Sequence, residues 1–283
     1  MLAKTVPEIS EVEAPVSPLV LVKGAGEMAS AIAWRLHMAN LRRICMLELD
    51  APLCVRREVS FCRALESGDA VVEGVRARAA RSRDEIERAW AEGDIAVVRV
   101  SDWPRIRDLD PEVVIDAILA KRNLGTRMDD ARLVVALGPG FAAGRDCHIV
   151  VETNRGHNLG RLILSGSAEP NTGIPGDIAG KTDERVLRAP AAGTFETERR
   201  IGDRIRRHEV VGKVAGQPVT AMLDGILRGL IRPGTAVVSG LKVGDIDPRG
   251  RREYCDTISD KARAIAGATL EAVMRSCNRF APH

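Results

Sequence analysis

The chain has 283 residues, of which 45% are hydrophobic and 29% charged, so it is long enough to bury a substantial core and is not a disordered chain. Its 42 basic and 39 acidic residues give a formal net charge of +3 and are spread along the sequence, so no basic tract indicates binding to nucleic acid or to an anionic membrane. Aromatic residues make up only 3%, which leaves no stacking platform for single-stranded nucleic acid.

The first eighteen residues contain three glutamates, three prolines and no long apolar core. We therefore expect residues 1–18 to form a flexible tail, neither a signal peptide nor an anchor. No stretch approaches the roughly 18 apolar residues of a membrane span. The six cysteines lie far apart without a C-x-x-C pair, which favours a reducing compartment and argues against structural zinc or an iron-sulfur cluster. The sequence predicts a soluble, cytoplasmic protein without a metal site.

An apolar run at residues 19–22 leads into a small-residue loop, which is followed by a helical pattern over 29–40 and a second apolar run over 44–48. Gly24, Gly26 and Ala29 fit the G-x-G-x-x-G/A spacing of a loop that holds a pyrophosphate at a helix N-terminus. Glu48 and Asp50 follow about 20 residues later, where a dinucleotide-binding fold places the carboxylate that binds a ribose. The pattern predicts a Rossmann-like, doubly wound parallel sheet. A plain strand-to-helix turn is the alternative interpretation of the same loop.

Further elements follow in chain order. We expect a helix from Pro52 to Gly68, short strands over 70–72 and 75–79, and a helix that begins at Ser82 with a capping box. Short apolar runs then predict buried strands, and these are 94–100, 113–116, 133–137 and 148–152.

Polar or glycine-rich sequence follows two of these predicted strands. Lys121 comes after the strand at 113–116, and Gly138 and Gly140 come directly after the strand at 133–137. Because ligands of open α/β sheets collect at the carboxyl ends of the strands, these residues are candidates for a binding cleft, with ordinary loop chemistry as the alternative. The aperiodic stretch 166–176 is long for a connector, and we expect it to form a binding lid.

The second half of the chain contains an internal repeat. Residues 189–214 match residues 221–246 at a constant offset of 32, which predicts a small two-fold β barrel or sandwich. The repeat resembles the biotinyl/lipoyl carrier domain. However, the hairpin 215–218 that joins the two halves has no lysine to modify, so we expect no covalent biotin or lipoate. The predicted organisation is a tail at 1–18, a Rossmann-like nucleotide-binding domain with a lid loop at 19–183, a β domain at 184–250 and a C-terminal helix at 251–283.

Several runs along the chain are similar to one protein family. These runs are Gly138–Phe141, Glu152–His157, Pro170–Gly173, Asp224–Leu230, Asp245–Arg249 and Ile258–Arg263. Through them, the sequence resembles the selenium-dependent molybdenum hydroxylase system proteins (YqeB-like). The resemblance implies an accessory or maturation factor for molybdenum hydroxylases of the xanthine dehydrogenase type. Such a factor would bind a dinucleotide-like ligand, NAD(P) or the molybdopterin dinucleotide, and its partner would be the hydroxylase or another maturation protein.

Two alternatives remain open at the level of sequence. An NAD(P)-dependent oxidoreductase would use the same loop and acid, with Lys121, His157 or His148 as the proton-transfer group. A non-catalytic adaptor would instead use the β domain to dock onto a partner. The apolar stripe of the C-terminal helix is core packing by default, and a homo-oligomer interface is the second interpretation.

Cys147 is a candidate sulfur or selenium carrier. It lies between Arg145-Asp146 and His148, and neighbouring positive charge can lower the pKa of a thiol below its ordinary value of about 8.5. A buried cysteine that acts as a small hydrophobic residue is the alternative.

Overall fold

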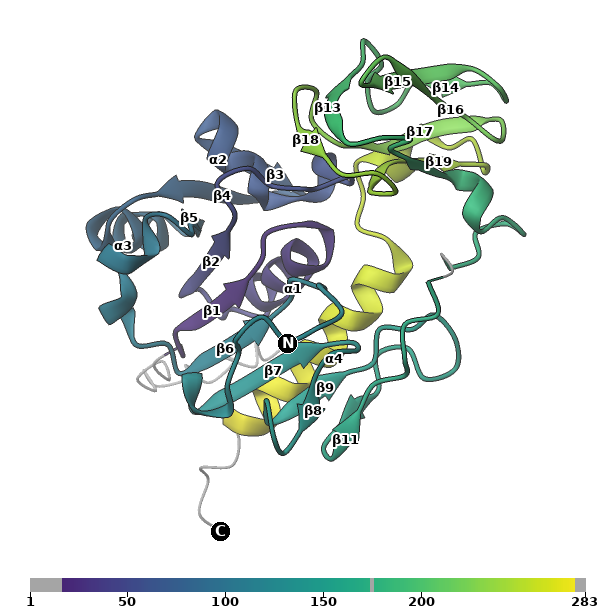
Figure 1. Ribbon diagram of the computed structural model, residues 1–283. Helices are drawn as coiled ribbons and strands as arrows, with labels where there is room; N and C mark the ends of the chain where they lie inside the picture. The colour runs from purple at the N-terminus through teal and green to yellow at the C-terminus, as the bar shows by residue number, and fades with distance from the viewer. Residues whose placement is uncertain (1–16, 174–175, 278–283) are drawn as a thin grey trace, which may run out of the picture.

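The computed structural model describes residues 17–173 and 176–277 (Figure 1). Residues 1–16 of the expected tail and residues 174–175 of the expected lid loop lie outside the described residues.

The first part of the chain is built on a nine-stranded mixed sheet, in the order β10-β9-β7-β6-β1-β2-β5-β4-β3. Its strands are β1 (Val20–Lys23), β2 (Ile44–Glu48), β3 (Asp69–Val72), β4 (Val75–Ala80), β5 (Ile95–Arg99), β6 (Val113–Asp116), β7 (Leu133–Leu137), β9 (Ile149–Val151) and β10 (Leu162–Ile163). The central strands are parallel, whereas β3 and β10 at the two edges pair antiparallel with their neighbours. The apolar runs expected to form strands are confirmed as strands, with ends shifted by a residue or two.

The described part of the chain has four α-helices, α1 (Glu27–Met38), α2 (Ala64–Ser67), α3 (Arg83–Ala91) and α4 (Asp260–Cys277). Short 3₁₀ helices connect other elements, at Arg57–Val59, Phe61–Arg63, Trp103–Arg105, Arg107–Leu109, Met128–Asp130, Asp183–Arg185 and Arg252–Cys255.

The expected doubly wound Rossmann sheet is wrong. A doubly wound sheet has crossover helices between its successive parallel strands, and these helices cover both faces of the sheet. Here the connection from β6 to β7 contains only a 3₁₀ turn, and the one from β7 to β9 contains only the two-residue strand β8 (Ala142–Ala143), which pairs with β11 (Gly166–Ser167). The antiparallel edge strands also make the sheet mixed.

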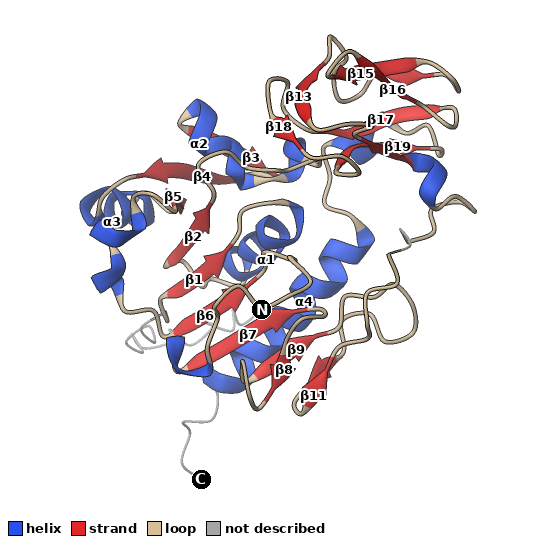
Figure 2. Ribbon diagram, viewed as in Figure 1, coloured by secondary structure: helices blue, strands red, loops and turns tan. Residues whose placement is uncertain are grey.

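Each face of the sheet has its own core because successive strand residues point to opposite sides. On one face, α1 and α4 pack together on residues such as Val22 and Ile115 (Figures 1 and 2). On the other face, α3 and the loops before β6 and after β7 cover residues such as Leu21 and Val114. A helix from the far end of the chain therefore replaces the missing crossover helices.

The predicted helix from Pro52 to Gly68 is also wrong. The segment forms two 3₁₀ turns and then the one-turn helix α2. Its backbone N–H groups have partners outside the segment, since Phe61 donates to the Ser30 hydroxyl at 2.7 Å and Cys62 to the Ala25 carbonyl at 3.0 Å. Tertiary contacts here override the apolar spacing that predicted a helix.

The second part of the chain forms two four-stranded antiparallel sheets, in the orders β12-β19-β17-β14 and β16-β15-β13-β18. The strands are β12 (Val186–Arg188), β13 (Gly193–Glu196), β14 (Arg204–Ile205), β15 (Val210–Val214), β16 (Gln217–Thr220), β17 (Gly225–Leu230), β18 (Ala236–Val237) and β19 (Lys242–Asp247). The repeat of 32 residues relates β13, β14 and β15 to β17, β18 and β19. We call these two sheets, over residues 186–247, the β unit. The expected combination of a Rossmann domain with a biotinyl/lipoyl barrel is wrong, because the first part is a mixed sheet and the second part is two separate antiparallel sheets. The proposed domain boundaries stay a prediction.

The two parts of the chain are joined through Arg56, which is 5% exposed. Its guanidinium donates to the carbonyl oxygens of Arg228, Tyr254 and Thr257 at 3.0 to 3.1 Å. Leu230 in β17 adds a backbone hydrogen bond to the Val55 carbonyl at 2.7 Å. The β unit is thus held against the segment that follows β2, close to the carboxyl ends of the parallel strands.

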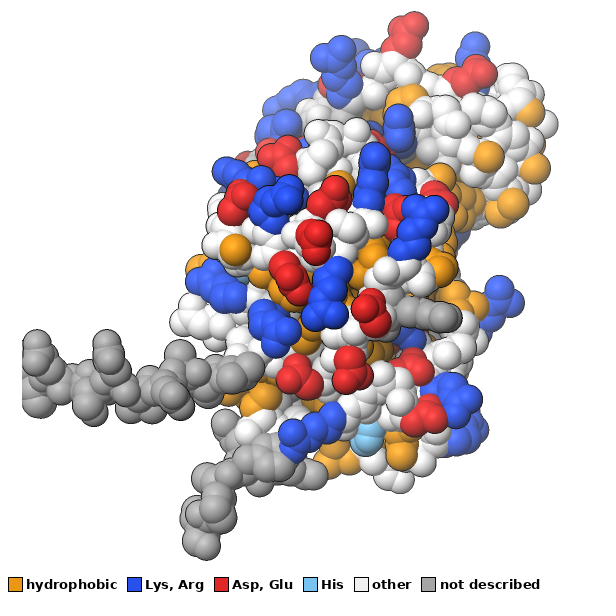
Figure 3. Space-filling view, turned by 90° about the vertical axis from the view of Figure 1, so that its left-hand side faces the viewer, with side chains coloured by type: hydrophobic (Ala, Val, Ile, Leu, Met, Phe, Trp, Pro, Cys, Tyr) orange, Lys and Arg blue, Asp and Glu red, His pale blue; other side chains and the backbone are white. Residues whose placement is uncertain are grey.

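Acidic and basic side chains are interspersed on the face shown in Figure 3, in keeping with the small net charge. Among the residues that the structure describes, no helix is both long and apolar enough to cross a membrane.

Candidate functional site

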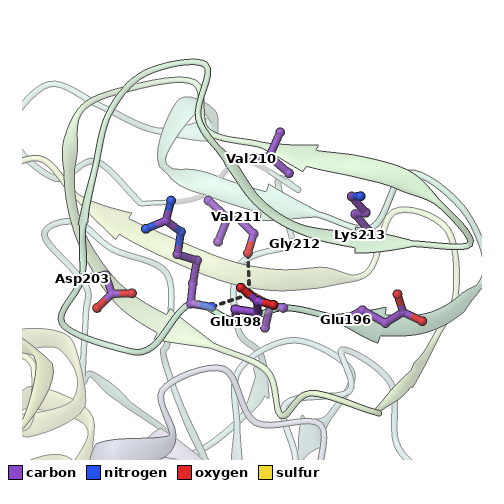
Figure 4. A pocket seen from close by; sticks show the side chains of 9 residues that line it. Glu196, Glu198, Asp203, Val210, Val211, Gly212 and Lys213 are labelled. Carbon is purple, nitrogen blue, oxygen red and sulfur yellow. Dashed lines mark hydrogen bonds between the residues drawn. The ribbon is translucent and has the colours of Figure 1, made fainter.

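One cavity, of about 780 Å³, is an open groove on the β unit beside β13 and β15. Figure 4 shows Glu196, Lys213 and Asp203 spread along its margins. Its Thr197 hydroxyl donates to the Val211 carbonyl at 2.5 Å. The charged groups do not converge on one point, so the groove has the character of an ordinary polar surface.

A second cavity, of about 510 Å³, lies at the carboxyl ends of β1, β2, β5 and β6. Five of the large apolar side chains that the structure leaves exposed line it, namely Leu49, Leu53, Val100, Ile118 and Leu124. Exposed apolar side chains gathered in one place indicate a binding surface more strongly than scattered ones do. We call this hollow the apolar cavity.

The loop at Gly24 and Gly26 forms one wall of the apolar cavity. The Ala25 N–H, which was expected to face a pyrophosphate, instead donates to the Glu48 carboxylate at 2.8 Å. Glu48 also accepts from the Leu49 N–H at 2.7 Å. Burial raises the pKa of Glu48, and these two hydrogen bonds oppose that rise. The carboxylate predicted to bind a ribose is therefore bound to the glycine loop itself.

A third cavity, of about 390 Å³, lies between the carboxyl ends of β7 and β9, the start of α4 and the β unit. Six basic side chains line it and only one acidic side chain, Glu169. The basic residues are Lys121, Arg155, Arg185, Arg188, Lys242 and Lys261. We call this hollow the cationic pocket.

The loops that follow β6 and β7 are tightly packed at this pocket. Gly140 has a φ of +107°, and a Cβ there would lie 2.6 Å from the backbone nitrogen of Arg122. On the loop after β6, Leu119 and Lys121 adopt positive φ values of 60° and 61°, which is uncommon for residues other than glycine. Such strain persists only where the surrounding structure imposes it, and it is concentrated at functional sites.

Several of the basic side chains are held by acidic partners behind the wall. Arg155 makes two hydrogen bonds to Asp260, at 2.6 and 3.0 Å. Arg185 and Lys242 both bind the fully buried Asp245. Burial alone would raise the pKa of Asp245, but the charges of Lys242, Arg228 and Arg185 outweigh it and lower the pKa to about 2. These pairs fix the position of the cations while leaving them at the pocket wall.

Lys121 and Lys261 differ from these residues. Within the described ranges, neither side chain has a hydrogen-bond or ion-pair partner, and both line the pocket. Lys121 is exposed, whereas Lys261 is partly buried at the start of α4. Burial lowers the pKa of Lys261, and the charges of Arg155 and Lys121 lower it further, while Glu27 and Glu152 partly oppose this shift. Two ammonium groups without a hydrogen bond or ion pair in the described chain therefore face the same small hollow.

The cationic pocket and the apolar cavity adjoin each other, because Leu119 and Lys242 line both. The two hollows lie side by side along the carboxyl edge of the sheet, the apolar cavity at the glycine loop and the cationic pocket at β7 and β9. The β unit contributes to the cationic pocket through Lys242 of β19 and Arg188 of β12.

The structure brings only some of the predicted site residues together. Lys121 lines the cationic pocket, and Gly138 and Gly140 shape the loop beside it, since a Cβ at Gly138 would lie 2.3 Å from the Thr153 hydroxyl. Gly24, Gly26 and Glu48 line the apolar cavity. Ala29 is buried in the core.

The remaining predicted site residues lie outside both cavities. Asp50 is exposed and accepts from the Ser101 hydroxyl at 2.8 Å. His157 is exposed on the loop after β9. Cys147 is fully buried among apolar residues, and burial raises the pKa of its thiol to about 12. Its reactivity stays a prediction that this environment disfavours.

Sequence reasoning missed Arg155, Arg185, Lys242 and Lys261 as site residues. One signal was present for Lys261, because a lysine in the first turn of a helix opposes the helix macrodipole and is unfavourable without a reason. The other three lie on separate segments that only the fold brings together.

Within residues 17–173 and 176–277, no group of three or more His, Cys, Asp or Glu side chains is placed to hold a metal ion.

The chain matches no family model. A curated relative, "Uncharacterized protein YqeB" of Escherichia coli (strain K12), is 48% identical over 256 residues, which cover 90% of this chain and 47% of that protein. The chain thus spans about half the length of this relative.

Solved structures with some likeness belong to the succinylglutamate desuccinylase and aspartoacylase proteins. One from Rhodobacter sphaeroides is 22% identical over 29% of each chain with a TM-score of 0.22. An aspartoacylase family protein from Mesorhizobium loti is 14% identical, covers 81% of this chain and 84% of its own, and has a TM-score of 0.24. Likeness at this level carries no argument about what this chain does.

These comparisons correct the family and function expected from the sequence. The relative is a YqeB protein, but its name assigns it no role in selenium or molybdenum metabolism, and no hydroxylase maturation protein or NAD-dependent enzyme is among the solved structures described. The expected maturation factor is therefore wrong, and so are the oxidoreductase and adaptor alternatives. The expected ligands and partners, and the absence of covalent biotin or lipoate, stay predictions.

Proposed function

We propose that this protein binds a small organic anion, with the negatively charged group of the ligand in the cationic pocket and an apolar portion in the adjoining apolar cavity. One observation carries the proposal: Lys121 and Lys261 face the same hollow of about 390 Å³, and neither makes an ion pair or hydrogen bond in the described part of the chain. A charge left partly buried without a partner is costly unless a ligand supplies the opposite charge.

The chemistry of the pocket selects for dense negative charge. Lysine ammonium groups bind phosphate and carboxylate as compact point charges, and arginine adds planar pairs of donors. Among the described residues, six basic side chains and one acidic side chain line the pocket, and Asp245 and Asp260 behind its wall offset only part of that positive charge. A ligand with a phosphate group or two carboxylates satisfies this surplus.

The apolar cavity adds a second requirement. Its exposed leucine, valine and isoleucine side chains cannot form hydrogen bonds with a ligand, so they favour contact with a hydrocarbon or flat ring portion. An amphipathic anion that spans the shared boundary at Leu119 and Lys242 would use both hollows.

Isothermal titration with inorganic pyrophosphate tests the anion site directly. We expect one pyrophosphate to bind per chain, and Lys121→Gln or Lys261→Gln to weaken binding about ten- to hundredfold, because losing a hydrogen bond to a charged group costs about 1.5–3 kcal/mol.

Lys213→Gln is the matched control, since it removes the same charge from an exposed lysine of β15 that lines the open groove and not the pocket. Equal weakening by all three substitutions would show a general effect of net charge and contradict the proposed site. Unchanged binding in the two pocket variants would contradict it as well.

A further inference from the structure

We propose that Lys261 is a nucleophilic amine that forms an imine with a carbonyl carbon of the bound anion, which makes the ligand a keto acid or an anionic aldehyde. This inference rests on the proposed anion site and extends it from binding to covalent chemistry.

Lys261 is placed where it can contact a ligand in the cationic pocket. It is the second residue of α4, partly buried, and its side chain reaches the wall of the cationic pocket. Three other lysines of the described chain are held by acidic partners: Lys23 binds Asp130 at 2.7 Å, Lys181 lies 3.6 Å from Glu184, and Lys242 binds Asp245 at 3.2 Å. Lys261 has no such partner within the described residues, so its nitrogen is available to a ligand.

The charged groups around Lys261 affect how readily its amine loses a proton. The groups that act on it are Arg155, Lys121, Glu27 and Glu152. Both carboxylates are engaged elsewhere: Glu27 accepts from the Ser259 hydroxyl at 2.9 Å, and Glu152 accepts from two backbone N–H groups at 2.7 and 2.8 Å.

The two cations and the positive end of the α4 dipole all disfavour a further positive charge at Lys261. With burial, they lower the pKa of the amine and increase the fraction that is neutral and nucleophilic. Lys121 is exposed to solvent by comparison, and it serves as a charge that holds the anion.

Imine formation needs only the Lys261 amine, the carbonyl group of the ligand and protons exchanged with solvent. The lone pair of the neutral Lys261 nitrogen attacks the carbonyl carbon, and the carbonyl oxygen takes up the proton that the nitrogen loses, which gives a neutral carbinolamine. A second proton, taken from solvent, lets the hydroxyl group leave as water while the nitrogen lone pair forms the C=N bond of the protonated imine. The carboxylate or phosphate of the same ligand remains paired with the fixed cations of the pocket, which would hold the carbonyl group next to the amine.

Borohydride trapping tests this inference. The full chain is incubated separately with pyruvate and with pyridoxal 5′-phosphate, reduced with sodium borohydride, and mapped by peptide mass spectrometry. We expect Lys261 to gain one carboxyethyl or phosphopyridoxyl group about tenfold faster than any other lysine, because the fixed cations of the pocket would hold the anionic probe beside this amine. Lys261→Arg should abolish trapping at α4, and Lys213→Arg should leave it unchanged.

Pyrophosphate titration of the same proteins separates the two proposals. Lys261→Arg keeps the positive charge, so it should still bind pyrophosphate while forming no imine. Wild-type protein that binds pyrophosphate but gives no adduct at Lys261 with either carbonyl probe, or that is labelled equally at all its lysines, would overturn the imine proposal alone. Loss of both pyrophosphate binding and adduct would overturn the anion site as well.

Discussion

At the scale of the residue, the candidate site depends on which charges have partners and which do not. Arg155, Arg185 and Lys242 carry a positive charge as Lys121 does, but each is paired with a carboxylate, Asp260 for Arg155 and Asp245 for the other two. Their acidic partners fix the walls of the pocket and leave the surplus charge on two lysines. The sequence could not predict this division, because the partners Asp245 and Asp260 lie 60 and 105 positions away from Arg185 and Arg155.

Gly140 gives a test of how tightly the loops beside the pocket are packed. Gly140→Ala should lower the free energy of unfolding by about 1–2 kcal/mol for its positive φ and by about 1–3 kcal/mol more for the clash with the Arg122 backbone. Gly144→Ala is the matched control, because Gly144 has a φ of +86° but open space around its Cβ position. Urea denaturation measures both values. If the two variants lose the same free energy, the loop after β6 does not constrain Gly140.

At the scale of the element, strands were more predictable than helices. The strands β1, β2, β6 and β7 are short apolar runs buried on both faces, and a run of that length and composition is typical of a central parallel strand. The segment at 52–68 has an equally good apolar stripe but forms 3₁₀ turns, since its N–H groups bond to α1 and to the loop before it. No local pattern contains that information.

The sequence also predicted the C-terminal helix, α4, but not the surface against which it packs. Its apolar stripe indicates burial without saying against what, and the structure places it beside α1 on the sheet built from the first half of the chain (Figure 1). That placement brings Lys261 to the loops after β6 and β9. The pocket draws on several separate segments, which is why sequence reasoning found Lys121 and missed most of the other residues.

The ion-pair cluster between β17, β19 and the turn before β12 gives a prediction about stability. Asp245→Asn leaves Arg185, Arg228 and Lys242 without their shared anion, so the free energy of unfolding at pH 7 should fall by about 3–5 kcal/mol. Asp256→Asn is the control, because the exposed pair of Asp256 with Arg252 contributes less than about 1 kcal/mol.

The pH dependence of this effect follows from the lowered pKa of Asp245. Its folded pKa of about 2 lies below the ordinary value near 3.9, so its stabilising contribution is complete above about pH 4 and is lost as pH falls toward 2. Urea denaturation at pH 7 and pH 3 should therefore show the gap between wild type and Asp245→Asn becoming smaller at the lower pH. A gap that is constant across this range would show that the carboxylate is not the group that pairs with these cations.

At the scale of the whole molecule, the cationic pocket and the apolar cavity lie where the two parts of the chain meet. The sheet supplies the glycine loop, the strand ends and the strained loop with Lys121, while the β unit supplies Lys242 and Arg188. Arg56 holds the parts together by three hydrogen bonds to backbone carbonyl groups. The β unit thus lines one side of the candidate site through these two side chains.

A crystal structure with pyrophosphate bound tests the central claim most directly, because it distinguishes the cationic pocket from the glycine loop. We predict density for one pyrophosphate with its oxygens about 3 Å from the ammonium groups of Lys121 and Lys261, and an unchanged hydrogen bond between the Ala25 N–H and Glu48. Density at the Gly24–Gly26 loop with Glu48 displaced, or density only on the open surface of the β unit, would contradict the account.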